Sequence, residues 1–313
     1  MNRILGLHHM TAICGDAQEN VDFYCGTLGL RLVKLTVNFD DPTAYHIYYG
    51  DGAGTPGTIL TFFPYPTAQT GRQGAGQAVV TSLSIPRGSK PYWKERLGDL
   101  AVDSETGDGL DFSDPDGLLL RLVPDVNYQL VAPWSQSPVP VEHQIGGMHS
   151  VTLRESSVEQ TAALLMRVLG FEHDPDIEVP EYVFFTGDRG MAKRVDVSTM
   201  GYTNARSGKG TVHHIAFRTP DDETQAELRK ELIEVGASVS EVRDRDYFRS
   251  IYFREPGGVL FEIATDAPGF AVDESPDALG TSLKLPQMHE ARRASIEAAL
   301  PKLRLPSTEA ASS

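Results

Sequence analysis

The sequence predicts an α+β protein in which one βαβββ unit occurs four times and builds two domains, each with a curved mixed sheet. Three observations predict this fold class. Four short apolar segments share a strand-like pattern, a segment with helical spacing follows most of them, and strand-rich sequence comes after each helix. An internal repeat of this kind indicates repeated structural units, which must pair to bury their sheet faces.

The first strand of each unit is rich in alternating or β-branched apolar residues. These strands are LHHMTAI from Leu7, VTSLSI from Val80, MHSVTL from Met148 and VHHIAF from Val212. Helical spacing follows in DAQENVDFYCGTLGL, SSVEQTAALLMRVLGF and DDETQAELRKELIEVGA, which close at Gly29, Gly170 and Gly236. The second unit is the most degenerate, and we expect a short helix around Tyr92–Leu97.

The remaining strands complete the units and suggest how the chain divides. The first unit continues with RLVKLTVNF, AYHIYYG and GTILTFF, and the fourth with SVSEVRD, RSIYFRE and GVLFEIATD. We expect consecutive units to share a sheet, which gives an N-terminal domain over 1–130 and a C-terminal domain over 146–268. The proline-rich APWSQSPVPVEH predicts a linker over 131–145. The tail over 269–313 is expected to be helical near Met288–Leu300.

Composition excludes several classes of function. A formal net charge of −15 over 313 residues disfavours nucleic-acid binding, which needs a basic face, and docking on anionic lipid. No apolar run reaches the roughly eighteen residues of a membrane span, and histidines interrupt the N-terminal apolar stretch where a signal peptide would need it. Two cysteines, Cys14 and Cys25, make no disulfide framework, so a cytoplasmic location is expected. Composition leaves the oligomeric state open, a homo-oligomer included.

The repeat places two histidines at one equivalent position. When the four first strands are aligned, His9 and His214 coincide, and Ser82 and Ser150 stand there in the other two units. Because alternate residues of a strand face the same side, both histidines are expected on the concave face of a sheet.

The last strands add a carboxylate. PGGVLFEIA in the fourth unit matches PDGLLLRLV in the second and TPGTILTFF in the first, so Glu262 corresponds to Arg121 and Phe62. A carboxylate flanked by apolar residues is costly to bury unless it is paired or ligated. We therefore expect His9, His214 and Glu262 to bind a metal, with no fourth protein ligand. This set leaves coordination positions open and favours Fe(II), although Mn(II) is also accepted. The competing interpretation is two buried histidines with ordinary hydrogen-bond partners.

These residues resemble the vicinal-oxygen-chelate superfamily, with its glyoxalase/bleomycin-resistance/extradiol dioxygenase fold, and within it the ring-cleaving dioxygenases that act on hydroquinones. The resemblance is carried by LHHMTAICGDAQENVDFYCGTLGLRLVK, GTPGTILTFFP, VHHIAFRTPD and YFRSIYFREPGGVLFEIATD, and it covers nearly the whole chain. The pattern Tyr252-x-x-Glu255-Pro256-x-Gly258-x-x-x-Glu262 is similar to the extradiol dioxygenase signature. That signature has a histidine where this chain has Arg245. The hydroquinone-cleaving branch departs from the signature in the same way, so Arg245 favours a hydroquinone over a catechol as the substrate. The resemblance implies an Fe(II) enzyme that uses O2 to cleave a small hydroquinone-like aromatic substrate.

Five further residues are candidates for the same site. Tyr252 is expected opposite Glu262 on a neighbouring strand, where its hydroxyl could orient a substrate oxygen. Arg245 could stabilise a phenolate, but on the residues alone it is better explained as a solvated arginine in EVRDRD. Strand alternation points His213 and His8 away from the ligand face, whereas the resemblance places both near the site as acid–base or supporting groups. Thr11 shares the face of His9 and could line the pocket.

Two other functions remain open on the same fold. One is a metal-dependent isomerase or thiol transferase, although glyoxalase I would need a second metal carboxylate where Phe62 stands. The other is a ligand-binding protein without chemistry, which normally lacks metal-binding residues. The remaining histidines have no symmetry-related partner and are expected to be ordinary structural residues: His46, His143, His149, His173 and His289. The ring substituents of the substrate cannot be predicted.

Overall fold

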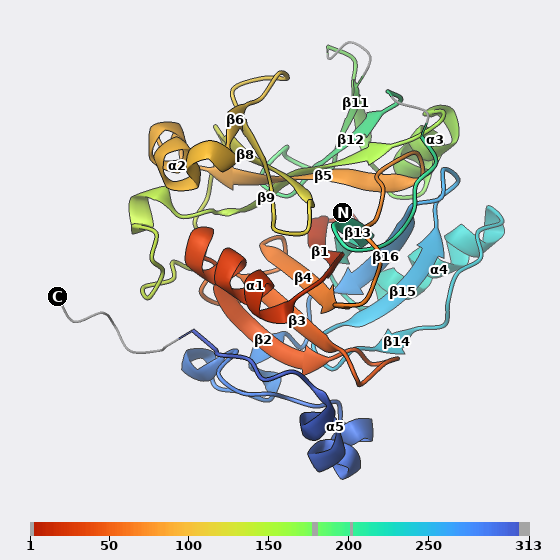
Figure 1. Cartoon of the computed structure of the whole chain (residues 1–313). Helices are drawn as coiled ribbons and strands as arrows, with labels where there is room; N and C mark the ends of the chain where they lie inside the picture. Colours follow the sequence, from red (N-terminus) through yellow and green to blue (C-terminus); the bar gives the residue numbers. More distant parts are fainter. Residues whose placement is uncertain (1–2, 177–180, 201–202, 307–313) are drawn as a thin grey trace.

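Two eight-stranded mixed sheets form the framework of the computed structural model, which describes residues 3–176, 181–200 and 203–306 (Figure 1). The first sheet has the order β14-β15-β16-β13-β1-β4-β3-β2. Its strands are β1 (Gly6–Cys14), β2 (Arg31–Val37), β3 (Tyr45–Gly50), β4 (Ile59–Pro64), β13 (Thr211–Thr219), β14 (Arg243–Asp244), β15 (Arg249–Arg254) and β16 (Leu260–Thr265). The second sheet has the order β10-β11-β12-β9-β5-β8-β7-β6. Its strands are β5 (Gln77–Ile85), β6 (Val102–Asp103), β7 (Leu110–Ser113), β8 (Leu119–Pro124), β9 (Gly147–Arg154), β10 (Glu172–Asp174), β11 (Glu181–Phe185) and β12 (Arg194–Ser198).

The α-helices of the described residues follow the first strand of each unit, except the last one, which lies in the C-terminal segment. They are α1 (Ala17–Val21), continued by a π-helix (Asp22–Thr27), then α2 (Lys90–Leu97), α3 (Glu159–Arg167), α4 (Asp222–Glu234) and α5 (Arg293–Ala299). Short 3₁₀ helices lie at Gly98–Leu100, Val141–His143, Phe270–Val272, Pro276–Ala278 and Gln287–Arg292. The predicted α+β class with four βαβββ units is therefore confirmed. No helix among the described residues is long and apolar enough to cross a membrane.

The pairing of the units differs from our expectation. The first strands β1 and β13 pair antiparallel, and so do β5 and β9, so the first unit shares a sheet with the fourth and the second with the third. The expectation that consecutive units share a sheet is wrong. All four first strands carry the same apolar pattern, so the pattern alone does not select a partner. The division of the chain at 1–130 and 146–268 stays a prediction.

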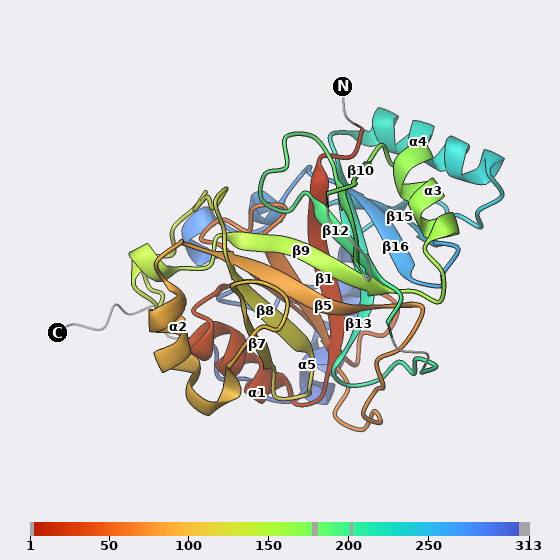
Figure 2. The ribbon, with the colours of Figure 1, turned by 90° about the horizontal axis from the view of Figure 1, so that it is seen from above.

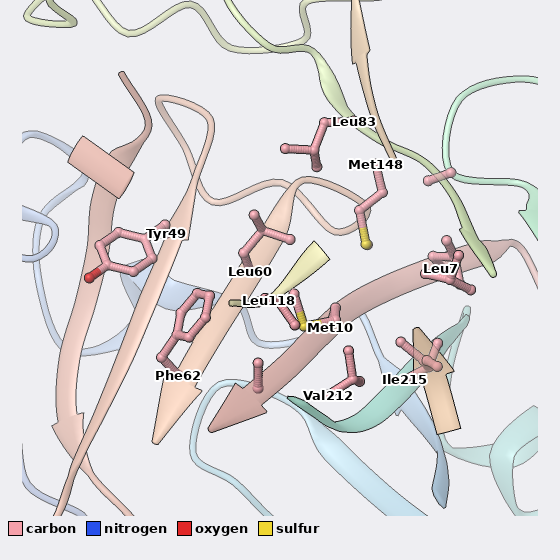
Figure 3. Packing of buried hydrophobic residues seen from close by; sticks show 14 of the residues in the cluster. Leu7, Met10, Tyr49, Leu60, Phe62, Leu83, Leu118, Met148, Val212 and Ile215 are labelled. Atoms are coloured by element: carbon pink, nitrogen blue, oxygen red, sulfur yellow. The ribbon is translucent and has the colours of Figure 1, made fainter. Parts of the chain in front are cut away.

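The hydrophobic core lies between the backs of the two sheets. Leu7, Met10 and Ile215 of the first sheet face Leu83 and Met148 of the second (Figure 3), and all five are at most 1% exposed. The central strands of the two sheets cross at a steep angle (Figure 2). Burying each of these side chains contributes about 1.5–3 kcal/mol. The opposite face of the first sheet is thereby left free for polar residues.

A buried carboxyl pair also joins the two sheets. Glu155 follows β9 of the second sheet, and Glu255 follows β15 of the first. Glu255 accepts hydrogen bonds from the Thr161 hydroxyl at 2.6 Å and from the backbone N–H groups of Gly257 at 2.9 Å and Val259 at 2.8 Å. Burial, followed by the charge of Glu255, raises the pKa of Glu155 to about 8. Glu155 therefore keeps its proton at neutral pH.

The C-terminal segment covers the outer strands of the first sheet. Lys34 of β2 is fully buried and pairs with Asp273 at 2.6 Å and with Glu274. The expected tail helix near Met288–Leu300 is present as the 3₁₀ turn at Gln287–Arg292 followed by α5, and residues 307–313 lie outside the described part of the chain. This segment also contributes the Phe270 ring to the aromatic cluster beneath the candidate site.

Candidate metal centre

Three predicted ligands converge on the free face of the first sheet. His9 of β1 and His214 of β13 approach each other with their Nε2 atoms 3.2 Å apart. Glu262 of β16 places Oε2 3.3 Å from the first of these atoms and 2.9 Å from the second. All three side chains are at most 6% exposed. They form the group of three His, Cys, Asp or Glu side chains that could bind a metal among the described residues.

The other nitrogens of both imidazole rings are already hydrogen-bonded. His9 Nδ1 lies 3.0 Å from His8 Nδ1, and His214 Nδ1 lies 2.8 Å from His213 Nδ1. If the ligand histidine donates in each pair, its Nε2 carries a bare lone pair that faces the centre. A hydrogen bond at one ring nitrogen commonly fixes the tautomer that binds a metal through the other. The two preceding histidines are thus placed to orient the two candidate ligands.

The three facing atoms fit a divalent cation. Glu262 Oε2 is buried and has no hydrogen-bond partner of acceptable geometry among the described residues. Ligands in adjacent positions at about 2.1 Å from an ion are about 3.0 Å apart, close to the three separations given above. Burial opposes ionisation of Glu262, but the adjacent His9 and His214 hold the pKa of this carboxyl well below its usual value. Burial also lowers the pKa of His214, which favours the neutral, ligating form.

Tyr252 and Arg245 form one wall of the centre. Tyr252 pairs with Glu262 in the antiparallel register of β15 and β16, as predicted from their spacing. The Arg245 Nε donates to the Tyr252 hydroxyl at 3.2 Å, and its side chain is only 16% exposed. The interpretation of Arg245 as a solvated arginine is therefore wrong. Because Arg245 supplies the donor in this bond, the phenol proton of Tyr252 is free to donate elsewhere.

The two neighbouring histidines depart from simple strand alternation. The β1–β13 ladder shifts register between Leu7 and His9 and again between Thr11 and Ala12, which leaves His8 and His213 as the extra residues of two bulges. A bulge re-aims the side chain, so His213 lines the same cavity as the ligands. His8 is 2% exposed and packs against Phe248 behind His9. Burial lowers the pKa of both His8 and His213 to about 3, so both are neutral at physiological pH.

Thr11 and Thr61 correct one detail of the repeat. Thr11 is fully buried and bonds Thr61 of β4, with the two hydroxyl oxygens 2.8 Å apart. Glu262 pairs with Ala216, two residues after His214, and Thr61 pairs with Thr11, two residues after His9. The position equivalent to Glu262 is therefore Thr61. Phe62, which the ungapped alignment placed there, points into the core on the other face (Figure 3). The expectation that the first unit supplies no carboxylate is unaffected.

The ligands open into a cavity of about 470 Å³. Phe63 and Phe248 contribute apolar rings to it. Its polar lining includes His46, so the expectation that His46 is an ordinary structural histidine is wrong. The lining also includes residues that sequence analysis did not assign to the site: Tyr48, Ser240 and Arg243. His46 and Tyr48 alternate with Ile47 in β3, and that spacing could have placed both on the ligand face. Ser250, also missed, donates to Glu262 Oε1 from the adjacent strand. The cavity is thus large enough for a single aromatic ring and is polar at several points.

Comparisons with known proteins agree on one family. A family model described as the Glyoxalase/Bleomycin resistance protein/Dioxygenase superfamily matches residues 6–86 and 147–263. A Bacillus subtilis (strain 168) protein named as a ring-cleaving dioxygenase, MhqO, is 42% identical over 303 residues, which cover 95% of this chain and 96% of that protein. The chlorohydroquinone/hydroquinone 1,2-dioxygenase of Sphingobium indicum is 37% identical and aligns with 91% of this chain and 93% of its own length.

Solved structures agree with the sequence comparisons. The crystal structure of a Bacillus subtilis protein described as a dioxygenase superposes with a TM-score of 0.92 at 40% identity, over 98% of this chain and 100% of that one. Glyoxalase I from Zea mays shares the fold at 14% identity, with a TM-score of 0.58 over 83% of this chain and 92% of that one. The chain therefore belongs to the Glyoxalase/Bleomycin resistance protein/Dioxygenase superfamily, also called the vicinal-oxygen-chelate superfamily.

Proposed function

We propose that this chain is an Fe(II)-dependent dioxygenase that cleaves the ring of a hydroquinone-like substrate, with the metal held by His9, His214 and Glu262. The observation that carries the proposal is the convergence of two Nε2 atoms and one carboxylate oxygen within 3.3 Å of one another at a buried position. Relatives named as ring-cleaving and hydroquinone dioxygenases align over more than nine-tenths of the chain and support the same reaction.

The ligand set favours this reaction over the alternatives on the same fold. Two histidines and one carboxylate leave positions open for both a substrate oxygen and O2, and this set is typical of Fe(II) oxygenases. Thr61 stands where an isomerase of this fold would place a second carboxylate ligand, and a hydroxyl is a poor substitute for it. When bound, Fe(II) supplies Lewis acidity toward a phenol oxygen and the redox chemistry that dioxygen requires.

The residues of the chain position the substrate. The rings of Phe63 and Phe248 give a flat aromatic substrate apolar surfaces to pack against. The free phenol proton of Tyr252 can donate to a substrate oxygen beside Glu262. His213 is neutral, and if His214 donates to its Nδ1, it presents Nε2–H to the cavity. These donors favour an electron-rich, deprotonated substrate oxygen over a neutral one.

Oxygen consumption tests the proposal. The protein is reconstituted with Fe(II) under anaerobic conditions and then mixed with air-saturated buffer and a panel of hydroquinones, with catechols alongside. We expect O2 uptake with hydroquinones and loss of uptake in His214→Ala. His149→Ala is the matched control, because His149 lies in the corresponding first strand β9 of the other sheet, outside this cavity.

The outcomes separate the candidate functions. Uptake with hydroquinones that His149→Ala retains and His214→Ala loses would support the proposal. A protein that binds metal but consumes no O2 with any aromatic compound would refute the dioxygenase and leave a metal-dependent isomerase or transferase.

A further inference from the structure

A row of hydrogen-bonded side chains crosses three strands on the ligand face of the first sheet. The Tyr48 hydroxyl lies 2.8 Å from His46 Nδ1, His46 Nε2 lies 2.8 Å from the Thr61 hydroxyl, and Thr61 lies 2.8 Å from the Thr11 hydroxyl. The row runs from β3 through β4 to β1, and Tyr48 pairs with Thr61 just as Thr61 pairs with Thr11. All four side chains are at most 8% exposed.

The Tyr48 end of the row has unused hydrogen-bonding capacity. Burial holds the pKa of His46 well below its usual value, so this ring is neutral, with one donor and one acceptor nitrogen. Both nitrogens are used, one by Tyr48 and one by Thr61. A phenol hydroxyl can both donate and accept, and within the described residues the Tyr48 hydroxyl has one partner, His46. Its remaining capacity is available to the cavity, which Tyr48 and His46 both line.

The position of Tyr48 suggests what it binds. In the first sheet, β3 is two strands away from β1. Because neighbouring strands lie about 4.8 Å apart, the backbone of Tyr48 is about 10 Å from the strand that carries His9. Tyr252 and Arg245 stand on the other side, next to Glu262. A para-dihydroxybenzene carries its oxygens at opposite ends of the ring. An oxygen beside the metal ligands would thus leave the second oxygen directed toward a distant polar group.

We propose that Tyr48, positioned by His46, is the specificity-determining residue that binds the second ring oxygen of a para-dihydroxybenzene. This inference rests on the proposed function, because it assumes that an aromatic substrate places its first oxygen at His9, His214 and Glu262. Thr61, at the position equivalent to Glu262, anchors His46 instead of contributing a metal ligand. In the first unit, the position equivalent to Glu262 thus supports the residues that bind the second ring oxygen of the substrate.

Ligand affinity tests the proposal without turnover. Hydroquinone and 4-methylphenol are titrated into the Fe(II)-reconstituted protein under strict anaerobiosis by isothermal calorimetry. The two compounds differ in whether a hydroxyl or a methyl group stands para to the first hydroxyl. We expect Tyr48→Phe to weaken hydroquinone about fivefold to tenfold, the effect of one hydrogen bond, and to leave 4-methylphenol unchanged.

Tyr49→Phe is the matched control. Tyr49 is the next residue of β3, is equally buried, faces the core, and bonds Asn20 through its hydroxyl at 2.9 Å. Removing that hydroxyl should change the ratio of the two affinities by less than twofold. A pair of His46 variants tests the positioning role. His46→Gln can still accept from Tyr48 and donate to Thr61 and should keep the discrimination, whereas His46→Leu should lose most of it.

Each outcome decides the proposal. Selective loss of hydroquinone affinity in Tyr48→Phe, with Tyr49→Phe unchanged, supports it. Equal weakening of both ligands, or no weakening of either, overturns the role of Tyr48 while the proposed function stands. If the wild-type protein binds neither compound, the proposed function fails and this inference fails with it.

Discussion

The buried pair of Glu155 and Glu255 makes the stability of this protein depend on pH in a direction that can be calculated. Glu255 accepts three hydrogen bonds, whereas neither carboxyl oxygen of Glu155 has a hydrogen-bond partner among the described residues. Glu155 is 1% exposed, and its pKa rises from 4.5 to about 8. Since the folded state holds this proton more tightly than the unfolded chain, its contribution is fully present below pH 4.5 and is lost progressively as pH rises to about 8.

The magnitude follows from the two pKa values. At 1.36 kcal/mol per pH unit, the rise from 4.5 to about 8 corresponds to at most about 5 kcal/mol. Relaxation around the charged pair and entry of water reduce this, so we expect about 2 kcal/mol. Glu155→Gln removes the titrating group and keeps an N–H donor for Glu255. It should therefore raise the free energy of unfolding by about 2 kcal/mol at pH 9 and leave it nearly unchanged at pH 5.

Urea unfolding at pH 5 and pH 9, followed by fluorescence and circular dichroism, measures this difference. Glu105→Gln is the control, because it removes the same charge from an exposed position in the loop before β7. It should shift the unfolding free energy by less than about 0.5 kcal/mol at either pH. If Glu155→Gln is no more stable than the wild type at pH 9, the conclusion that Glu155 has a raised pKa in the folded state is refuted.

Three further variants test the centre and its support. Glu262→Gln should reduce metal affinity by more than the roughly 10–100-fold that is typical of a residue supporting a ligand, because it removes the proposed anionic ligand itself. Equilibrium dialysis measures the metal affinity, and an unchanged affinity would contradict the proposal that Glu262 is a ligand. Arg245→Lys should lower kcat/KM for the proposed hydroquinone reaction more than tenfold, because the guanidinium hydrogen bond to Tyr252 is lost. If steady-state oxygen uptake shows equal activity, the hydrogen bond between Arg245 and Tyr252 does not contribute to the reaction. Lys34→Met should lower the free energy of unfolding by about 3 kcal/mol, because it leaves the buried Glu274 with only the more distant Lys284, at 4.0 Å, as a cation. A loss smaller than about 1 kcal/mol in urea unfolding would show that the pair of Lys34 and Glu274 contributes little.

The clustering of the candidate metal ligands was predictable, because the internal repeat shows which positions of different units are equivalent. His9 and His214 occupy the same place in two copies of one unit, and the structure brings their Nε2 atoms within 3.2 Å of each other. Tyr252 was equally accessible, since ten residues of separation across a tight turn place it opposite Glu262. These inferences need only strand periodicity, which is a local property.

What sequence analysis missed depends on register and on contacts between distant elements. The partner of β1 is β13, and nothing in the repeated pattern distinguishes β13 from β5 or β9 as that partner. Alternation cannot place His8 and His213, because each is the extra residue of a bulge. Arg245 appeared solvated because it lies in a charged run, whereas its burial comes from Tyr252 on the next strand.

The pairing of the first unit with the fourth has a consequence for folding during synthesis. His214 leaves the ribosome 205 positions after His9, and Glu262 later still. Closing a loop of 205 residues costs about 5 kcal/mol of chain entropy, which only the completed β1–β13 ladder and the core beneath it can offset. Strand β1 therefore keeps one edge unpaired until β13 (Thr211–Thr219) has been synthesised. The candidate metal centre can therefore form only after β16 has been synthesised, because a chain truncated before β16 lacks Glu262.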